Sequence, residues 1–146
     1  MHFPQEIVKL AKDTFGRVDV IFLNAGLMPN SPLSALKTDD WHQMVDVNIK
    51  GILNGVAAVL PTFTEQKSGH IVTTSSVAGL KAYPGGAVYG GTKWFVRDFM
   101  EVLRMESAME GTNIRTASAV YIVSAVITLC AATIAFGLLN RTVPTN

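Results

Sequence analysis

Short apolar runs alternate with longer helical segments along most of this 146-residue chain. Residues 18–23 and 70–75 are rich in β-branched side chains, as expected of buried parallel strands, and residues 114–117 start a third such run. Helical patterns cover the segments between and beside these runs: residues 5–15, 41–63 and 89–105. Strands that alternate with helices predict an α/β fold, in which a parallel sheet has helices on both faces.

The first two helices carry further signals. Pro4 lies near the start of the first helix, whose apolar stripe consists of Ile7, Leu10, Ala11 and Phe15. Thr38, Asp39 and Asp40 are expected to cap the second helix, which Gly51 and Gly55 interrupt.

Two polar residues follow the first two predicted strands. Asn24 comes directly after the first strand, and Ser76 comes directly after the second. Ligands in parallel α/β folds bind beyond the carboxyl ends of the strands. We therefore expect Asn24 and Ser76 to lie at the same edge of the sheet, beside a binding site.

Tyr89 and Lys93 are four residues apart in the third predicted helix, so their side chains share one face of it. A cation held beside a phenol favours the ionised phenol, which can then exchange a proton with an alcohol near neutral pH. Ser76 offers a hydroxyl for the same oxygen. Taken alone, the pair is a weak signal and fits better a surface helix with one aromatic and one charged side chain.

Four motifs occur in a fixed order. They are Asn24-Ala25-Gly26, Asn48 within residues 46–51, Ser76 within residues 75–79, and Tyr89-x-x-x-Lys93, separated by intervals of 24, 28 and 13 residues. This pattern resembles the short-chain dehydrogenase/reductase family in its NAD(P)-dependent form. The resemblance extends from about Pro4 to Thr116.

The resemblance implies an oxidoreductase that interconverts a carbonyl and an alcohol by hydride transfer. Tyr89 would be the general acid/base, and Lys93 would contact the nicotinamide ribose and favour the ionised Tyr89. Ser76 would hold the substrate oxygen, and Asn48 would keep a water that links Lys93 to solvent. Tyr89 and Lys93 would both contact the cofactor, whose site would also be lined by Asn24, Ala25 and Gly26. Such donors suit the alkoxide that hydride transfer creates.

The glycine-rich loop that binds the pyrophosphate in this family is not found in the sequence. Neither is the residue that separates NAD from NADP, so the cofactor is expected to be either one. We expect a truncated, partial Rossmann-like sheet that lacks the first βαβ unit. The alternative is a non-catalytic fragment that acts as an oligomerisation partner or a membrane-associated protein.

The chain divides into residues 1–116 and a divergent tail, residues 117–146. Residues 117–139 carry no charge and, as a helix, would span about 34 Å, between Arg115 and Arg141. One interpretation is a buried strand followed by an apolar core helix, and another is a transmembrane helix. A third is that the tail and the missing start are products of a truncated or misspliced gene model.

The net charge of +1, without a basic run, gives no reason to expect nucleic-acid binding. The single cysteine, Cys130, excludes an internal disulfide and fits a reducing compartment. No metal site is expected from the scattered His2, His42 and His70. The amino terminus does not resemble a secretory signal. The expected location is cytoplasmic, with a membrane anchor formed by the tail as the alternative.

The expected partners are a small alcohol or carbonyl substrate and further copies of the same chain. In the family that the sequence resembles, the long helices that hold Asn48 and Tyr89 commonly pack against their copies. We therefore expect a homo-oligomer formed through these two helices.

Overall fold

A computed structural model describes residues 3–120 of the chain. The helices and strands follow one another in the order α1 (Phe3–Phe15), β1 (Val20–Leu23), the short η1 (Leu33–Ala35), α2 (Thr38–Val45), the π-helical η2 (Asp46–Lys50), α3 (Gly51–Gln66), β2 (Gly69–Thr74), the short η3 (Val77–Gly79), α4 (Ala87–Glu110) and β3 (Ile114–Ala119). The predicted alternation of strands and helices is confirmed.

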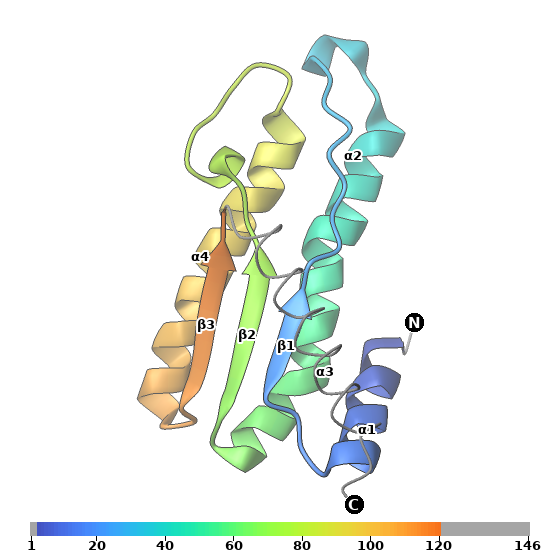
Figure 1. Cartoon of the computed structure of the whole chain (residues 1–146). Coiled ribbons are helices and arrows are strands. Elements are labelled where there is room, and N and C mark those ends of the chain that lie inside the picture. The colour runs from blue at the N-terminus through green and yellow to red at the C-terminus, as the bar shows by residue number, and fades with distance from the viewer. Residues whose placement is uncertain (1–2, 121–146) are drawn as a thin grey trace, which may run out of the picture.

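The three strands form one parallel sheet in the order β1-β2-β3. Ile21 aligns with Ile71, which aligns with Thr116, so these three side chains share one face. This face packs against α3 and α4, which lie behind the sheet in Figure 1. The core between them is formed by Ile52, Val56, Val59, Phe63, Ile71, Val96, Met100, Leu103 and Ile114. The predicted α/β fold with a parallel sheet is therefore confirmed.

The opposite face of the sheet is not covered by any helix among residues 3–120. Its middle row consists of Phe22, Val72 and Ala117, and Val20 lies beside this row. Val20 is 58% exposed and Phe22 is 38% exposed. Two expectations therefore need correction for the described residues: helices flank only one face of the sheet, and β1 is half-exposed rather than buried. The reason is that Val20 and Phe22 lie on the face that no described helix covers, whereas Ile21 and Leu23 pack against the core.

The long predicted helix is present and is continuous from α2 through η2 to α3. The predicted cap is wrong: the helix begins after Lys37, no side chain caps it, and Thr38, Asp39 and Asp40 form its first turn. The two carboxylates still favour this end of the helix, because the helix dipole is positive there. Gly55 allows a close approach to β1, since a Cβ at this position would lie 2.3 Å from a methyl group of Leu23.

One described helix, Thr38–Gln66, is long and apolar enough to cross a membrane by length and composition alone. Because its carboxyl-terminal half buries Val56, Val59 and Phe63 against the sheet, we interpret it as a core helix. Of the uncharged residues 117–139, the first three belong to β3. Val120 follows as the last described residue, and residues 121–139, including Cys130, lie outside the described part of the chain.

The helix α1 packs on α3 through one side of its surface. Its buried residue is Val8, whereas Ile7, Leu10 and Phe15 of the predicted apolar stripe are exposed. Of the expected stripe, only Ala11, which is half-buried, lies on the face that α1 buries. The reason is tertiary packing. Among the described residues, α1 packs against α3, and this contact buries the side of α1 that carries Val8.

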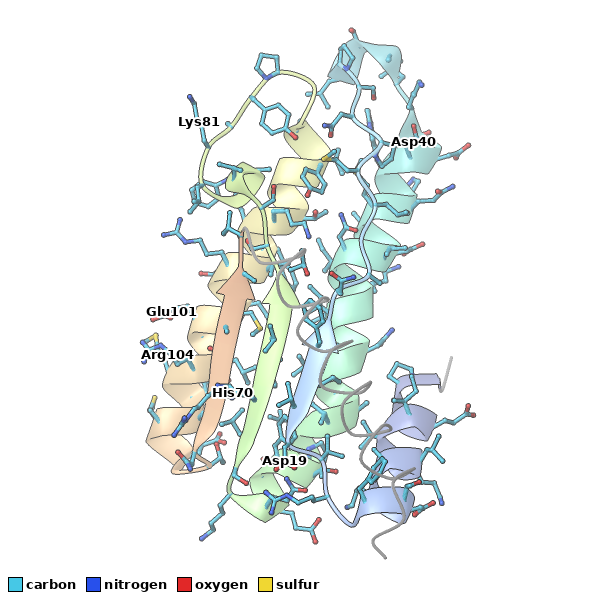
Figure 2. All side chains as sticks on the ribbon, viewed as in Figure 1. Asp19, Asp40, His70, Lys81, Glu101 and Arg104 are labelled. Carbon is cyan, nitrogen blue, oxygen red and sulfur yellow. The ribbon has the colours of Figure 1, made fainter. Side chains whose placement is uncertain are left out.

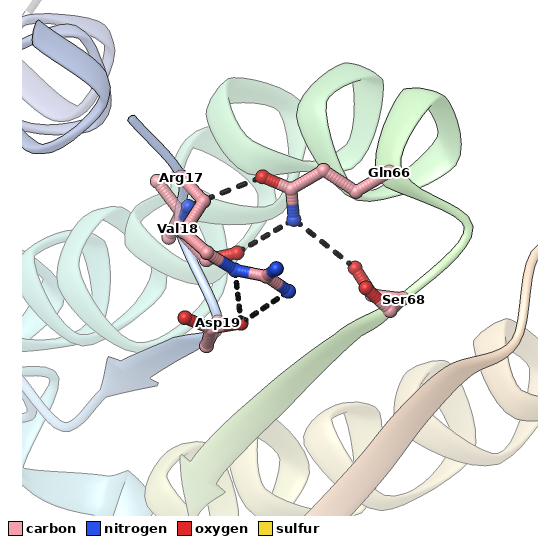
Figure 3. A network of polar contacts seen from close by, with 5 residues as sticks. All are labelled: Arg17, Val18, Asp19, Gln66 and Ser68. Atoms are coloured by element: carbon pink, nitrogen blue, oxygen red, sulfur yellow. Dashed lines mark hydrogen bonds and ion pairs between the residues drawn. The ribbon is translucent and has the colours of Figure 1, made fainter. Parts of the chain in front are cut away.

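The start of β1 is held by the side chain of Gln66 at the end of α3 (Figure 3). Gln66 Oε1 accepts from the Val18 N–H at 3.1 Å, and Nε2 donates to the Val18 carbonyl at 2.7 Å and to the Ser68 carbonyl at 3.3 Å. The amide thus pairs with both backbone groups of Val18, as a neighbouring strand would. This places the first strand relative to the long helix.

We expect Gln66→Ala to lower the free energy of unfolding by about 1–3 kcal/mol, because it leaves partly buried backbone groups of Val18 without partners. Urea unfolding followed by circular dichroism measures this difference. Gln43→Ala, which changes an exposed glutamine on α2, is the matched control and should have little effect. Equal stabilities of the two variants would contradict the role of Gln66.

Candidate functional site

The carboxyl ends of β1 and β2 meet at one edge of the sheet, where the segments carrying Asn24 and Ser76 begin. In Figure 2, Asp40 and Lys81 mark the segments that rise beyond this edge, whereas Asp19 and His70 mark the opposite end of the sheet. Thr74 Oγ1 donates a hydrogen bond to Asn24 Oδ1 at 2.7 Å, which joins the two strand ends. The structure therefore places the predicted turn and the predicted serine at the same edge.

A groove of about 460 Å³ runs along the outer edge of β1. Apolar residues of α1, β1 and α3 line it, and it reaches Asn24 and Ala25 at the carboxyl end of β1. Two residues of the predicted cofactor-lining turn are therefore accessible from this groove. No group of three or more potential metal-ligating side chains occurs within residues 3–120.

Lys93 extends from α4 to the end of β2. The residue is only 4% exposed, and its Nζ donates a hydrogen bond to the Thr74 carbonyl at 2.7 Å. Burial lowers the pKa of the Lys93 ammonium from its ordinary value of 10.5, because the charged form loses solvation. The structure thus holds the Lys93 ammonium at the carboxyl edge of the sheet, although its burial costs solvation free energy.

Tyr89 lies beside this ammonium. Lys93 Nζ is 5.7 Å from the centroid of the Tyr89 ring, so the two side chains share a face of α4. The tyrosine is half-buried, whereas the lysine is buried. A half-exposed phenol next to a buried cation is an arrangement suited to passing a proton to a ligand at the surface.

Asn48 is fully buried at the centre of the π-helical segment η2. Its Oδ1 accepts from the Leu27 N–H at 2.8 Å, and its Nδ2 donates to the Leu27 carbonyl at 2.9 Å. Segments with π-helical turns are frequent at functional sites. Here the side-chain amide holds the turn that follows β1, while its predicted role in keeping a water stays a prediction.

Gly26 belongs to the turn that Asn48 holds. A Cβ at Gly26 would lie 3.4 Å from Asn48 Oδ1 and 3.8 Å from Lys93 Nζ. The turn, Asn48 and Lys93 are therefore neighbours in space, although the sequence separates them by many residues. A side chain at Gly26 would be in van der Waals contact with both atoms.

Ser76 is half-buried and begins the short helix η3, where its Oγ accepts from the Ala78 N–H at 3.2 Å. Ser75, by contrast, is buried, and its N–H donates to the Ala119 carbonyl at 2.9 Å. The short helix η3 ends at Gly79, which lies against α4. The approach is so close that a Cβ at Gly79 would lie only 2.8 Å from the Lys93 carbonyl oxygen. Ser76 is thus on a turn that rests on the backbone of Lys93.

Two residues near the site were missed in the sequence. Thr92 is buried and bonds to both Asn48 and the Tyr89 carbonyl. The sequence could have indicated Thr92 by its position, because a residue three after Tyr89 lies on the same side of the helix as Tyr89. Gly79 belongs to the predicted motif of residues 75–79, but no sequence signal indicated its contact with the backbone of Lys93.

Comparisons with known proteins identify the family of the chain. The family model described as short chain dehydrogenase matches residues 2–129. An uncharacterized oxidoreductase of Listeria innocua is 75% identical over 114 residues, which cover 78% of this chain and 46% of that protein. The chain therefore spans about half the length of the curated relatives that it matches.

Two solved structures are similar over most of the described fold. A short-chain dehydrogenase/reductase of Burkholderia phymatum in complex with NAD has a TM-score of 0.75 at 30% identity, covering 79% of this chain and 41% of that one. The closed form of a serine dehydrogenase complexed with NADP+ has a TM-score of 0.67 at 37% identity, covering 71% of this chain and 42% of that one.

Proposed function

This chain belongs to the short-chain dehydrogenase/reductase family, which is a family of oxidoreductases, and from that premise we propose that it carries the reacting side chains of an NAD(P)-dependent enzyme. The proposed reaction interconverts a carbonyl and an alcohol. The observation that carries the proposal is the buried Lys93 ammonium beside the half-exposed Tyr89, at the carboxyl edge of the sheet.

In the proposed reduction, Tyr89 Oη gives its proton to the substrate oxygen as the carbonyl carbon gains a hydride. The products are an alcohol and a tyrosinate, which the neighbouring ammonium of Lys93 stabilises. Ser76 Oγ holds the substrate oxygen and stabilises the charge that develops there. Asn48 keeps a water through which the site regains its proton. Oxidation of an alcohol follows the same steps in reverse.

The residues present fit the nicotinamide ribose of a dinucleotide. Lys93 and Tyr89 offer donors for ribose hydroxyls, and the bare Gly26 leaves room next to Lys93 Nζ. The backbone of Asn24, Ala25 and Gly26 would line this part of the site. When bound, the dinucleotide supplies or accepts the hydride.

The comparisons indicate which cofactors and which substrate to test first. One similar structure holds NAD, and the other, a serine dehydrogenase, holds NADP+. We propose that both nicotinamide cofactors be tested and that serine be among the first alcohols. Neither choice follows from the residues of this chain.

The experiment that tests the proposed function is a fluorescence titration of the purified chain with NADPH and with NADH. We expect binding in the micromolar range for one of them, followed by turnover with a carbonyl substrate. The absence of binding at millimolar concentrations of both would overturn the proposal for this chain and favour the alternative described next.

The second candidate is a non-catalytic fragment that associates with further chains through its two long helices. The observation that favours it is a set of exposed apolar side chains on α3 and α4: Leu53, Trp94, Val102, Met105 and Met109. Association through these helices would remove the exposed apolar side chains from water. Light scattering that shows a stable dimer without cofactor binding would support this candidate, and a monomer would contradict it.

We further propose a cytoplasmic location, with attachment to a membrane through residues 117–139 as the alternative. Recovery of the whole chain in a salt-washed soluble fraction would contradict attachment.

A further inference from the structure

Thr92 makes two hydrogen bonds that meet at one hydroxyl. The residue is 1% exposed, its Oγ1 donates to the Tyr89 carbonyl at 2.7 Å, and the same oxygen accepts from Asn48 Nδ2 at 3.1 Å. A hydroxyl has one proton and two lone pairs, so both bonds can exist at once. Thr92 is therefore a fixed link between α4 and η2.

The link continues through Asn48 to the turn that follows β1. Asn48 uses its Oδ1 and its Nδ2 on the backbone of Leu27, at 2.8 and 2.9 Å. One unbroken series of hydrogen bonds thus runs from Leu27 through Asn48 and Thr92 to Tyr89. It ends on main-chain atoms on both sides, so it locates backbone segments relative to one another.

A purely local explanation accounts for only half of this arrangement. Threonine inside a helix often bonds to a carbonyl three or four residues earlier, which explains the bond to Tyr89. It does not explain why the same hydroxyl meets a fully buried amide from another helix. A valine at this position would fill the same space but would leave Asn48 Nδ2, which is buried, with one partner fewer.

We propose that Thr92 is a positioning residue, whose hydroxyl sets the place of Tyr89 and Lys93 relative to Asn48 and the Gly26 turn. This inference rests on the proposed function of Tyr89 and Lys93. A shift of reacting groups by about 1 Å can cost about a hundredfold in rate, so a link of this kind matters although it touches no substrate.

Hydrogen exchange followed by NMR tests the link without any need for activity. The Leu27 N–H bonds to Asn48 Oδ1, so its exchange rate reports how firmly Asn48 is held. We expect Thr92→Val to raise this rate about tenfold while the amide of Ile71, in the buried middle strand, keeps its rate. Thr92→Ser retains the hydroxyl and should restore protection of Leu27.

Thr112→Val is the matched control, because it removes a buried hydroxyl at the other end of α4, where Thr112 Oγ1 lies 2.8 Å from Ser107 Oγ. It should not change exchange at Leu27 relative to Ile71. Unchanged exchange at Leu27 in Thr92→Val, or equal acceleration at Leu27 and Ile71, would overturn the inference.

A second measurement applies if the chain turns over. Thr92→Val should lower kcat about 10- to 100-fold with little change in the KM for the cofactor, and Thr92→Ser should recover most of it. Unaltered kcat in Thr92→Val would contradict the positioning role. If the unmodified chain shows no turnover at all, the proposed function fails, and hydrogen exchange alone decides on Thr92.

Discussion

Replacement of Tyr89 by phenylalanine should lower kcat by about 10²- to 10⁴-fold, the range that positioned general acids and bases contribute. The substitution removes one hydroxyl and keeps the ring beside Lys93, whose Nζ is 5.7 Å from the ring centroid. Binding of the cofactor should change little, because the proposed site also offers Lys93 and the backbone of residues 24–26. Steady-state absorbance of NAD(P)H measures turnover, and a fluorescence titration measures binding.

Tyr83→Phe is the matched control for this prediction. Tyr83 lies on the loop between η3 and α4, and its hydroxyl accepts a hydrogen bond from Asn30 Nδ2 at 3.2 Å. Loss of this exposed hydroxyl should leave kcat within about twofold of its original value. A Tyr89→Phe chain that is as active as the Tyr83→Phe chain would rule out Tyr89 as the acid/base.

Lys93→Met should abolish most activity without destabilising the fold near neutral pH. The side chains have similar length, and methionine removes a charge that is buried at a cost in solvation. We expect kcat to fall by about a hundredfold or more, since the proposed tyrosinate loses its cation. The free energy of unfolding at pH 7 should stay equal or rise, although the bond to the Thr74 carbonyl is lost.

The stability difference between Lys93→Met and the original chain should depend on pH in a defined direction. The folded-state pKa of Lys93 lies below the ordinary value of 10.5, so between these two values the unfolded chain binds more protons than the folded one. The cost of the buried charge is therefore fully present below the folded-state pKa and disappears as the pH rises toward 10.5. Any gain in stability of Lys93→Met over the original chain should shrink across this interval.

Urea unfolding at pH 7, 8.5 and 10 measures the difference. Lys81→Met is the control, because Lys81 is an exposed lysine on the loop beyond the sheet edge (Figure 2) and should show no such dependence. A Lys93→Met chain that is clearly less stable at every pH would show that the bond to Thr74 outweighs the cost of burial. A fully active one would remove Lys93 from the proposed mechanism.

The sequence predicted the parts of this fold that depend on local patterns. The runs that became β1, β2 and β3 are short and β-branched, and the spacing of Tyr89 and Lys93 placed both on one helix face. These features follow from residues close together in the chain, so a pattern reveals them. The same holds for the position of Ser76, because the end of a strand predicts where the next turn lies.

The missed features depend on contacts between distant segments. Val8, rather than the predicted stripe, is the buried residue of α1 because α3 lies on that side. Thr92 matters because Asn48 reaches it from another helix, 44 residues away in sequence. The capping prediction at Thr38 failed because the helix begins at Thr38, three residues before the predicted start at residue 41. None of these is visible without the neighbouring element.

The close contact of Gly79 with Lys93 has a consequence for how such a site can evolve. Gly79 rests on the carbonyl of Lys93 and not on its ammonium, so the position of the serine-bearing turn does not depend on which side chain α4 presents there. Selection can then exchange the reactive groups one at a time while the scaffold keeps its shape. The glycine itself is the costly position to change, because any larger residue would push the turn off the helix. Relatives that have lost the catalytic activity should therefore retain Gly79 longer than they retain Lys93.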